Sequence, residues 1–231
     1  MELQLRELQT AAPCMPIQPP MYEFVGDVFN IVESAYAPLN VNREIFLREL
    51  IYNAIDAVRI RGDSEDDSLD MDHAIRVVLD LRNRVVSVED TGVGFTKAQL
   101  VEGLGTVGAS GTQTYVHQRF PGSKLTPLPL FGRLGLGFYS AFPVSRMIKV
   151  VTKSCNDEQY VWKWESGSNE YSVECDNEFL CGRLNRGTQV HCFLKDDATE
   201  LLQERRLEPV LELHAHRIKT PIVLVTKRSY G

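Results

Sequence analysis

Apolar residues recur along the chain with two different periods, which predict separate helices and strands. A helical spacing of apolar positions predicts helices over 24–36, 42–61, 96–103, 137–143 and 197–219. Alternating positions or short apolar runs predict strands over 74–81, 84–89, 147–153, 159–165, 170–174, 188–194 and 221–227. Because strands outnumber helices in the second half, we expect an α+β fold, a two-layer sandwich of a mostly antiparallel mixed sheet with helices on one face.

Two stretches lack such periodicity. Residues 1–20 hold four prolines and no apolar core typical of a signal peptide, so we expect an extended or mobile arm before one domain over 21–231. Glycines and prolines crowd the stretch 104–137. A glycine-bounded segment of this length inside a compact domain is usually a functional lid or a disordered loop. We expect a mobile lid over 104–131 that contains short helical pieces.

Composition narrows the class of protein. The 231 residues are 43% hydrophobic and 24% charged, which is ordinary for one globular domain. A net charge of −6 argues against a nucleic-acid binder, and no apolar run has the length of a membrane span. The five cysteines form no Cys-x-x-Cys pair, so we expect reduced thiols and an intracellular location.

The helix expected over 42–61 carries an unusual polar stripe. Glu49, Asn53 and Asp56 are spaced i, i+4 and i+7, so they share one helical face beside an apolar surface. Buried acids and amides without partners cost free energy, so this stripe needs either a ligand or solvent. The alternative is an amphipathic helix with a solvated face.

Two glycine-containing segments follow this helix. Asp90-Thr-Gly-Val-Gly94 comes at the end of an expected strand, where glycines permit a sharp turn and close approach of a ligand. Gly132-Arg-Leu-Gly-Leu-Gly137 opens an apolar helical run, so its N–H groups can face a phosphate. Either segment alone is a weak indication of a ligand-binding site. The acid-amide helix, the aspartate turn and the glycine loop, in that order over about ninety residues, form a strong signal in combination.

These segments, together with Gly187-Thr188, resemble the ATP-binding superfamily of gyrase, heat-shock protein 90, histidine kinases and MutL. The following segments are most similar to the amino-terminal domain of heat-shock protein 90 chaperones: Ile45-Phe-Leu-Arg-Glu-Leu-Ile51, Leu104-Gly-Thr106, Ser110-Gly-Thr112, Gly137-Phe-Tyr-Ser140 and Arg186-Gly-Thr188. The similarity covers about 23–227, and the phrase Phe-Leu-Arg-Glu-Leu-Ile is specific to that family.

The resemblance implies roles for the helical stripe. Glu49 matches the general base that activates the attacking water, a role that suits a carboxylate in phosphoryl transfer. The alternative is a structural acid paired with Arg48 or Arg43. Asn53 matches a magnesium ligand, since Mg²⁺ takes few protein oxygens besides phosphates and water. Asp56 is expected to brace the site through hydrogen bonds.

The resemblance also assigns residues to the bound nucleotide. Asp90 matches the aspartate that accepts a hydrogen bond from the adenine amino group, assisted by the Thr188 hydroxyl. Gly94 lets the base lie against the backbone. The remaining residues expected to line the cofactor-binding site are Phe95, Leu104, Arg133, Gly135, Gly137 and Phe138. The alternative for Phe138 is an aromatic residue that packs in the core, and the sequence does not distinguish this from a residue that lines the pocket.

Several positions depart from the family pattern. Phe95 stands where methionine is usual, Ala109 replaces a phosphate-binding lysine, and Gly103 replaces an asparagine near the ribose. Arg133 replaces a glutamine. We hypothesise that Arg133 restores positive charge near the phosphates, and the alternative is an arginine that points into solvent.

The sequence therefore predicts an ATP- and ADP-binding, weakly hydrolysing chaperone domain that uses Mg²⁺. Alternatives are a nucleotide-binding module without turnover, or a MutL- or gyrase-type ATPase. The resemblance implies client proteins, co-chaperones and homodimerisation for the full-length protein, with the isolated domain a monomer. It also implies a middle domain, absent from this chain, that supplies an arginine. Similarity of 31–36 and 137–142 to the bacterial and mitochondrial branch leaves the compartment open between mitochondrial and cytoplasmic.

Overall fold

The computed structural model describes residues 19–36, 42–63, 75–121, 130–132, 134–215 and 221–227. Helices and 3₁₀ turns lie at α1 (Val28–Tyr36), α2 (Ile45–Asp63), α3 (Lys97–Gly105), α4 (Gly111–Arg119), η2 (Gly137–Ala141), η3 (Asp196–Leu202) and α5 (Glu204–Ala215). Strands lie at β1 (Met21–Glu23), β2 (Ile75–Asp80), β3 (Val85–Asp90), β4 (Ser145–Lys153), β5 (Gln159–Glu165), β6 (Glu170–Cys175), β7 (Gly187–Leu194) and β8 (Ile222–Lys227).

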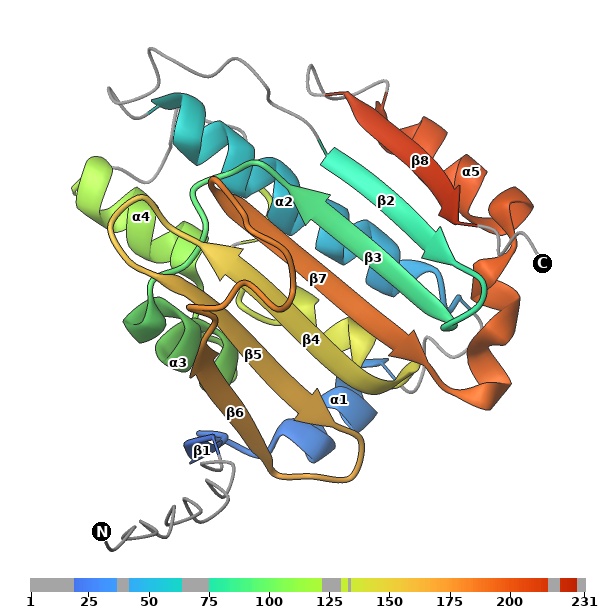
Figure 1. The fold of residues 1–231 in the computed structure, drawn as a ribbon, viewed down its shortest axis with the longest axis horizontal. Helices are drawn as coiled ribbons and strands as arrows, with labels where there is room; N and C mark the ends of the chain where they lie inside the picture. Colours follow the sequence, from blue (N-terminus) through green and yellow to red (C-terminus); the bar gives the residue numbers. More distant parts are fainter. Residues whose placement is uncertain are drawn as a thin grey trace, which may run out of the picture.

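The strands form one eight-stranded sheet in the order β1-β6-β5-β4-β7-β3-β2-β8. All neighbouring strands pair antiparallel except β2 and β8, which are parallel. Helices α1 to α4 lie together on one face of the sheet, and the connection between β6 and β7 crosses the other (Figure 1). The expected α+β fold with a mostly antiparallel mixed sheet is therefore confirmed.

The core lies between the sheet and these helices. Helix α2 buries a stripe of large apolar side chains, including Phe46, Leu47, Ile51 and Ile55. Trp162 is fully buried on the facing side of the sheet, where Phe24, Phe138 and Tyr171 surround it. Burying apolar surface is the main favourable term in folding, so α2 is fixed firmly to the sheet and can hold polar groups in place.

Most expected elements are confirmed, with two corrections in the helices. The helix expected from residue 24 begins at Val28, because Gly26 has a φ of +102° and the backbone of Val25 bridges to Thr106 instead. The preceding strand β1 was missed. The helix expected over 197–219 is two elements, because Gln203 is extended at φ −85° and ψ 116° between η3 and α5.

Two smaller differences concern the region of the site. Helix α2 begins at Ile45 rather than near Asn42, and the run expected as a helix from Gly137 is a 3₁₀ turn that ends at Ala141. The expected hairpin around Arg82-Asn83 is confirmed as β2 and β3. Of the predicted arm, only Pro19 and Pro20 lie in the described ranges, and 122–129 of the predicted lid lie outside them.

Candidate functional site

The polar stripe of α2 faces the glycine loop. Asp56 is buried, with 1% of its surface exposed, as deeply as the apolar residues Phe46 and Ile55 of the same helix. Its carboxylate accepts hydrogen bonds from the backbone N–H groups of Gly132 at 2.7 Å and Phe131 at 2.9 Å. The Thr112 hydroxyl donates a third, longer bond at 3.3 Å. Asp56 thus ties α2, the glycine loop and α4 together.

The pKa of the Asp56 carboxyl group is raised, because burial penalises its charged form. The hydrogen bonds from Gly132, Phe131 and Thr112 oppose that rise, and so does the positive charge of Arg59. The closest hydrogen-bond partners of the Asp56 carboxylate are therefore backbone N–H groups. Such a carboxylate is an anchor for a loop, which agrees with the bracing role implied by the resemblance.

Asn53 lies one turn before Asp56 and contacts the same loop. A Cβ atom placed on Gly132 would lie 2.7 Å from the Asn53 Oδ1 atom, which is too close for any side chain to be accommodated without movement. Glycine at position 132 therefore lets the backbone approach the amide oxygen. The carbonyl oxygen of Asn53 is directed at the loop where the resemblance places the phosphates.

Glu49 lies one further turn toward the start of α2 and has two neighbours. Its Oε1 atom is paired with the Arg48 guanidinium group at 2.8 Å. Its Oε2 atom lies 2.8 Å from the point that a Cβ on Gly137 would occupy. The structure thus shows the Arg48 ion pair considered as an alternative. It also brings the other carboxylate oxygen to the end of the glycine loop. Arg43 instead pairs with Asp197 and Glu200.

Asp90 ends strand β3 and begins the second part of the site. Its Oδ1 atom accepts a hydrogen bond from the Gly92 N–H group at 2.8 Å, which closes the turn. A Cβ on Gly92 would lie 2.5 Å from the Ala57 carbonyl carbon of α2, so only glycine fits there. Arg61 of α2 donates to the Thr91 carbonyl oxygen at 2.6 Å. The Asp90 turn is therefore clamped onto the end of α2.

Burial raises the pKa of the Asp90 carboxyl group from 3.8 to about 7. Asp90 is half-buried at the end of β3. Hydrogen bonds from the Gly92 and Thr188 backbone N–H groups oppose the rise. Any ligand that donates a hydrogen bond to this carboxyl group stabilises its charged form.

Thr188 lies on β7 directly beside Asp90, and its hydroxyl is buried in a chain of polar groups. The Thr152 hydroxyl accepts from the Phe95 N–H group at 2.9 Å, and its oxygen lies 3.1 Å from the Gly187 carbonyl oxygen and 3.0 Å from the Thr188 hydroxyl. Because Thr152 has one hydrogen, donation to Gly187 leaves Thr188 as the donor to Thr152. Sequence reasoning missed Thr152, since an alternating strand threonine carries no distinguishing signal.

Gly94 is required by packing within the fold. Its φ is +66°, and a Cβ there would lie 2.1 Å from the Lys153 carbonyl oxygen. Phe95 is partly buried against the main core. The side chains of Leu104 and Phe138 are both 7% exposed within that core, and the Tyr139 hydroxyl donates to the Leu104 carbonyl oxygen. Contacts of these residues with a nucleotide stay a prediction.

The glycine loop also touches the start of the predicted lid. Gly135 has a φ of +65°, and a Cβ on it would lie 2.2 Å from the Ala109 carbonyl oxygen. The Ser110 hydroxyl donates to the Gly132 carbonyl oxygen at 2.6 Å and also caps α4. Arg133 lies outside the described residues, so its predicted phosphate contact stays a hypothesis.

Both parts of the site converge on adjacent residues of one helix. The glycine loop binds Asp56, and the Asp90 turn packs on Ala57. A ligand that spans the two parts would place one end at Asp90 and its other end at Asn53 and Glu49. Of the described residues singled out from the sequence, Glu49, Asn53 and Asp56 of α2 contact the glycine loop, and the Asp90 turn packs on the end of the same helix.

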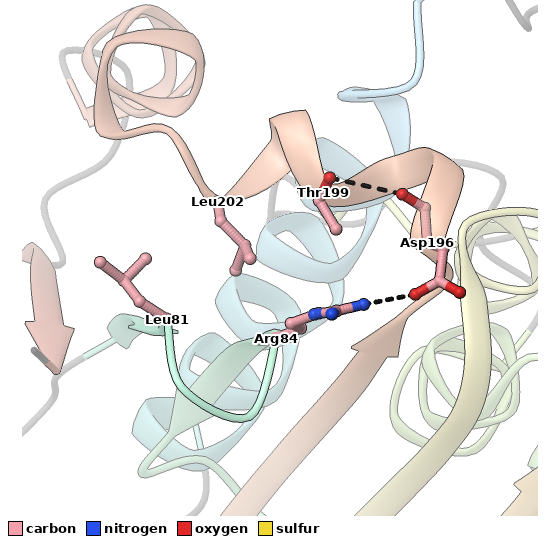
Figure 2. Close-up of a pocket in the computed structure, with 5 residues that line it drawn as sticks. All are labelled: Leu81, Arg84, Asp196, Thr199 and Leu202. Carbon is pink, nitrogen blue, oxygen red and sulfur yellow. Dashed lines mark hydrogen bonds and ion pairs between the residues drawn. The ribbon is translucent and has the colours of Figure 1, made fainter. Parts of the chain in front are cut away.

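A pocket of about 590 Å³ lies elsewhere, lined by Leu81, Arg84, Asp196, Thr199 and Leu202 (Figure 2). Arg84 and Asp196 form an ion pair across it. It adjoins the turn between β2 and β3, at the opposite end of β3 from Asp90. This pocket does not adjoin the residues singled out from the sequence.

Two further observations concern metals and membranes. Within the described ranges, no group of three or more His, Cys, Asp or Glu side chains is placed to hold a metal ion. Among the helices of those ranges, none has the length and apolar character that a membrane crossing requires.

The part of the chain that holds these contacts matches a known protein family. A family described as "Histidine kinase-, DNA gyrase B-, and HSP90-like ATPase" matches residues 41–178, which include α2, the Asp90 turn and the glycine loop. An endoplasmin homolog of Hordeum vulgare is 35% identical over 215 residues, covering 88% of this chain and 25% of the relative.

Two other relatives show similar coverage. The chaperone protein HtpG of Wolinella succinogenes is 34% identical over 209 residues, covering 88% of this chain and 33% of the relative. An endoplasmin homolog of Caenorhabditis elegans is 32% identical over 228 residues, covering 96% of this chain and 29% of the relative. The chain thus spans between a quarter and a third of the length of these relatives.

Proposed function

Because the chain belongs to the histidine kinase-, DNA gyrase B- and HSP90-like ATPase family, as an ATPase domain of the heat-shock protein 90 type, we propose that the site on α2 binds ATP and hydrolyses it slowly. The observation that carries this proposal is the meeting of Glu49, Asn53 and Asp56 with the backbone of the glycine loop. An acid and an amide beside the backbone of a glycine loop suit a nucleotide phosphate better than a solvated helix face.

The adenine end of the nucleotide lies at Asp90. Adenine presents an amino donor beside a ring-nitrogen acceptor, so a carboxylate in an enclosed position reads its amino group. Asp90 lies half-buried at the end of β3, where the Gly92 and Thr188 backbone N–H groups donate to its carboxylate. Thr188 supplies a hydroxyl oxygen at the neighbouring register position.

The phosphate end lies between α2 and the glycine loop. Asn53 would hold Mg²⁺ through its amide oxygen, and the small Gly132 leaves that oxygen clear of a side chain. When bound, the ion neutralises part of the phosphate charge. The loop N–H groups beyond Gly132 would donate to phosphate oxygens, since Gly132 and Phe131 already donate to Asp56.

Glu49 is the residue that accepts a proton from the attacking water. Its Oε2 atom lies at Gly137, where the loop ends, so it is near the phosphates and free of the Arg48 pair. Arg48 holds the other oxygen and orients the carboxylate. A base with one oxygen engaged in an ion pair is consistent with slow turnover.

The activity of the whole protein is a further step of the proposal. Relatives named as a chaperone and as endoplasmin homologs support a chaperone that acts on client proteins with co-chaperones and dimerises through parts beyond this domain. The domain by itself is expected to be a monomer. We place the protein inside the cell, in mitochondria or cytoplasm. The four described cysteines are free thiols, which agrees with a reducing compartment.

Competition between purine nucleotides tests the proposed base recognition. Calorimetric titration of this chain with ATP and with GTP, each with Mg²⁺, should show binding of ATP and much weaker binding of GTP. Guanine carries a carbonyl where adenine carries its amino group, so Asp90 would face an acceptor. Equal affinities, or no binding of either nucleotide, would overturn the proposal.

A further inference from the structure

Three side chains meet where the chain enters the glycine loop, two from α2 and one from Phe131. The rings of Tyr52 and Phe131 are stacked, with centroids 4.3 Å apart and planes 12° from parallel. The Arg59 guanidinium group lies 5.2 Å from the centroid of the same Phe131 ring. Stacked aromatic pairs and arginine–ring contacts are both favourable beyond simple burial.

This arrangement continues the polar stripe of α2. Tyr52, Asp56 and Arg59 are spaced i, i+4 and i+7, so one face of the helix contacts one short segment of the loop. Asp56 accepts hydrogen bonds from the Phe131 backbone while Tyr52 and Arg59 contact the Phe131 ring. Phe131 is therefore held on α2 by both its backbone and its side chain.

Phe131 is not itself a core residue. It keeps 42% of its surface exposed, whereas its neighbour Leu130 is buried with Ile60 of α2 and Val116 of α4. A phenylalanine that stays this exposed gains little from burial. Its stacking on α2 instead fixes the direction in which the chain leaves toward Gly132.

The loop is held again at its far end. Gly137 lies against the Oε2 atom of Glu49, about one turn before Tyr52 on α2. The backbone between Phe131 and Gly137 must therefore span a fixed distance along the helix. Movement of the Phe131 end would shift the N–H groups that lie between these two fixed points.

We propose that Tyr52 is a positioning residue, which acts through Phe131 to set the affinity of the glycine loop for nucleotide phosphates. The inference rests on the proposed function, because it assumes that the loop binds phosphate. Tyr52 touches the loop and not the reacting atoms. Its loss should weaken ligands in proportion to their phosphate contacts and spare the adenine contact at Asp90.

The test compares adenosine, ADP and ATP binding to this chain by calorimetry with Mg²⁺. Tyr52→Ala should weaken ATP and ADP by roughly three- to tenfold, the range expected for loss of one aromatic stack, and leave adenosine within about twofold. Tyr52→Phe should restore the wild-type values, because it keeps the ring. Phe131→Leu should match Tyr52→Ala, and combining the two should add little further loss.

A matched control removes a similar contact elsewhere. Phe193 on β7 lies 5.6 Å under the Arg146 guanidinium group, on the face of the sheet opposite α2. Phe193→Ala therefore deletes a ring beneath an arginine without touching the glycine loop, and it should leave all three affinities unchanged. Adenosine binding by each variant also shows that the domain is folded.

The outcomes separate the two hypotheses. If wild-type chain binds no ATP, the proposed function fails. If wild type binds ATP but Tyr52→Ala keeps its ATP-to-adenosine affinity ratio, the positioning role fails while the function stands. An equal loss of all three ligands shows a general structural role and also overturns the inference. Failure of Tyr52→Phe to restore ATP affinity would show that the hydroxyl, not the stack, matters.

Discussion

The Asp56 carboxylate accepts a hydrogen bond from the backbone N–H group of Gly132 at 2.7 Å, across a sequence separation of 76 residues. Gly132 in turn approaches Asn53 so closely that a Cβ atom at its position would lie 2.7 Å from the Asn53 Oδ1 atom, and the amide would have to move. These contacts fix the glycine loop to the same helix that carries Glu49. They make α2 the element on which the phosphate half of the site is built.

Replacing Asp56 by alanine should destabilise the domain. The Phe131 and Gly132 N–H groups would lose their acceptor, and an unsatisfied buried donor costs about 1–3 kcal/mol. Urea unfolding should show this loss in the free energy of unfolding. Asp27→Ala removes an exposed acceptor of one backbone N–H group and should cost less. Equal losses in the two variants would contradict the anchoring role of Asp56.

Glu49→Ala should abolish turnover while ATP binding persists. The carboxylate accepts a proton in the reaction, whereas the nucleotide is held by Asp90, Asn53 and the loop. A general base typically contributes about 10²- to 10⁴-fold to a rate. Phosphate release and calorimetry on the same preparations measure the two properties. If turnover survives in Glu49→Ala, Glu49 is only the partner of Arg48.

Asn53→Ala should weaken ATP with Mg²⁺ but spare adenosine. The amide oxygen is proposed to act through the metal and the phosphates, and adenosine has neither. Titration of both ligands with Mg²⁺ and with a chelator separates the effects. Equal weakening of adenosine would make Asn53 a structural residue that supports Gly132.

Adenosine affinity should rise with pH up to about 7 and then level off. The free Asp90 carboxyl group has a pKa of about 7, and a donated hydrogen bond from adenine favours its ionised form. Binding therefore releases a proton below that pH, and affinity falls by up to about tenfold per unit of pH there. Calorimetry in buffers of different ionisation enthalpy detects the proton. A flat pH profile between 5.5 and 8 would contradict this.

The same shift affects stability in the ligand-free chain. The folded pKa of Asp90 lies above its ordinary value of 3.8, so the unfolded chain releases its proton at lower pH. The contribution of Asp90 to stability is thus present below about pH 4 and is lost as pH rises through 7. In Asp90→Asn this part of the pH dependence of unfolding should disappear.

Much of the fold could be predicted because, in most of the chain, the spacing of apolar residues matches the helix or strand that forms there. The alternation of apolar and polar positions predicted the strands of the sheet. Helix α3 begins where it was expected, because Thr96 caps it with a hydroxyl that accepts from the Gln99 N–H group. The helix break at Gln203 could not be predicted, because buried apolar residues such as Leu201 and Leu207 lie on both sides of it and no glycine or proline marks it. The positive φ of Gly26 similarly delays α1 without a signal in the apolar pattern.

The site was predictable where helical spacing placed groups together. Glu49, Asn53 and Asp56 share a face by periodicity alone, and the glycines marked where backbone approaches closely. The stack of Tyr52 on Phe131 was not predictable, because it joins segments far apart in the chain and both residues look ordinary in isolation. The core positions of Leu104 and Phe138 likewise depend on tertiary packing.

The most direct measurement of the central claim is calorimetric titration of ADP into wild-type chain and Asp90→Asn. The substitution keeps the size of the side chain but can place an N–H donor opposite the adenine amino group. An opposed polar contact in an enclosed pocket costs about 1–3 kcal/mol or more, so affinity should fall at least about tenfold. Circular dichroism should show an intact fold in both proteins. If Asp90→Asn bound ADP as tightly as wild type, Asp90 would not read the base and the assigned nucleotide site would be wrong.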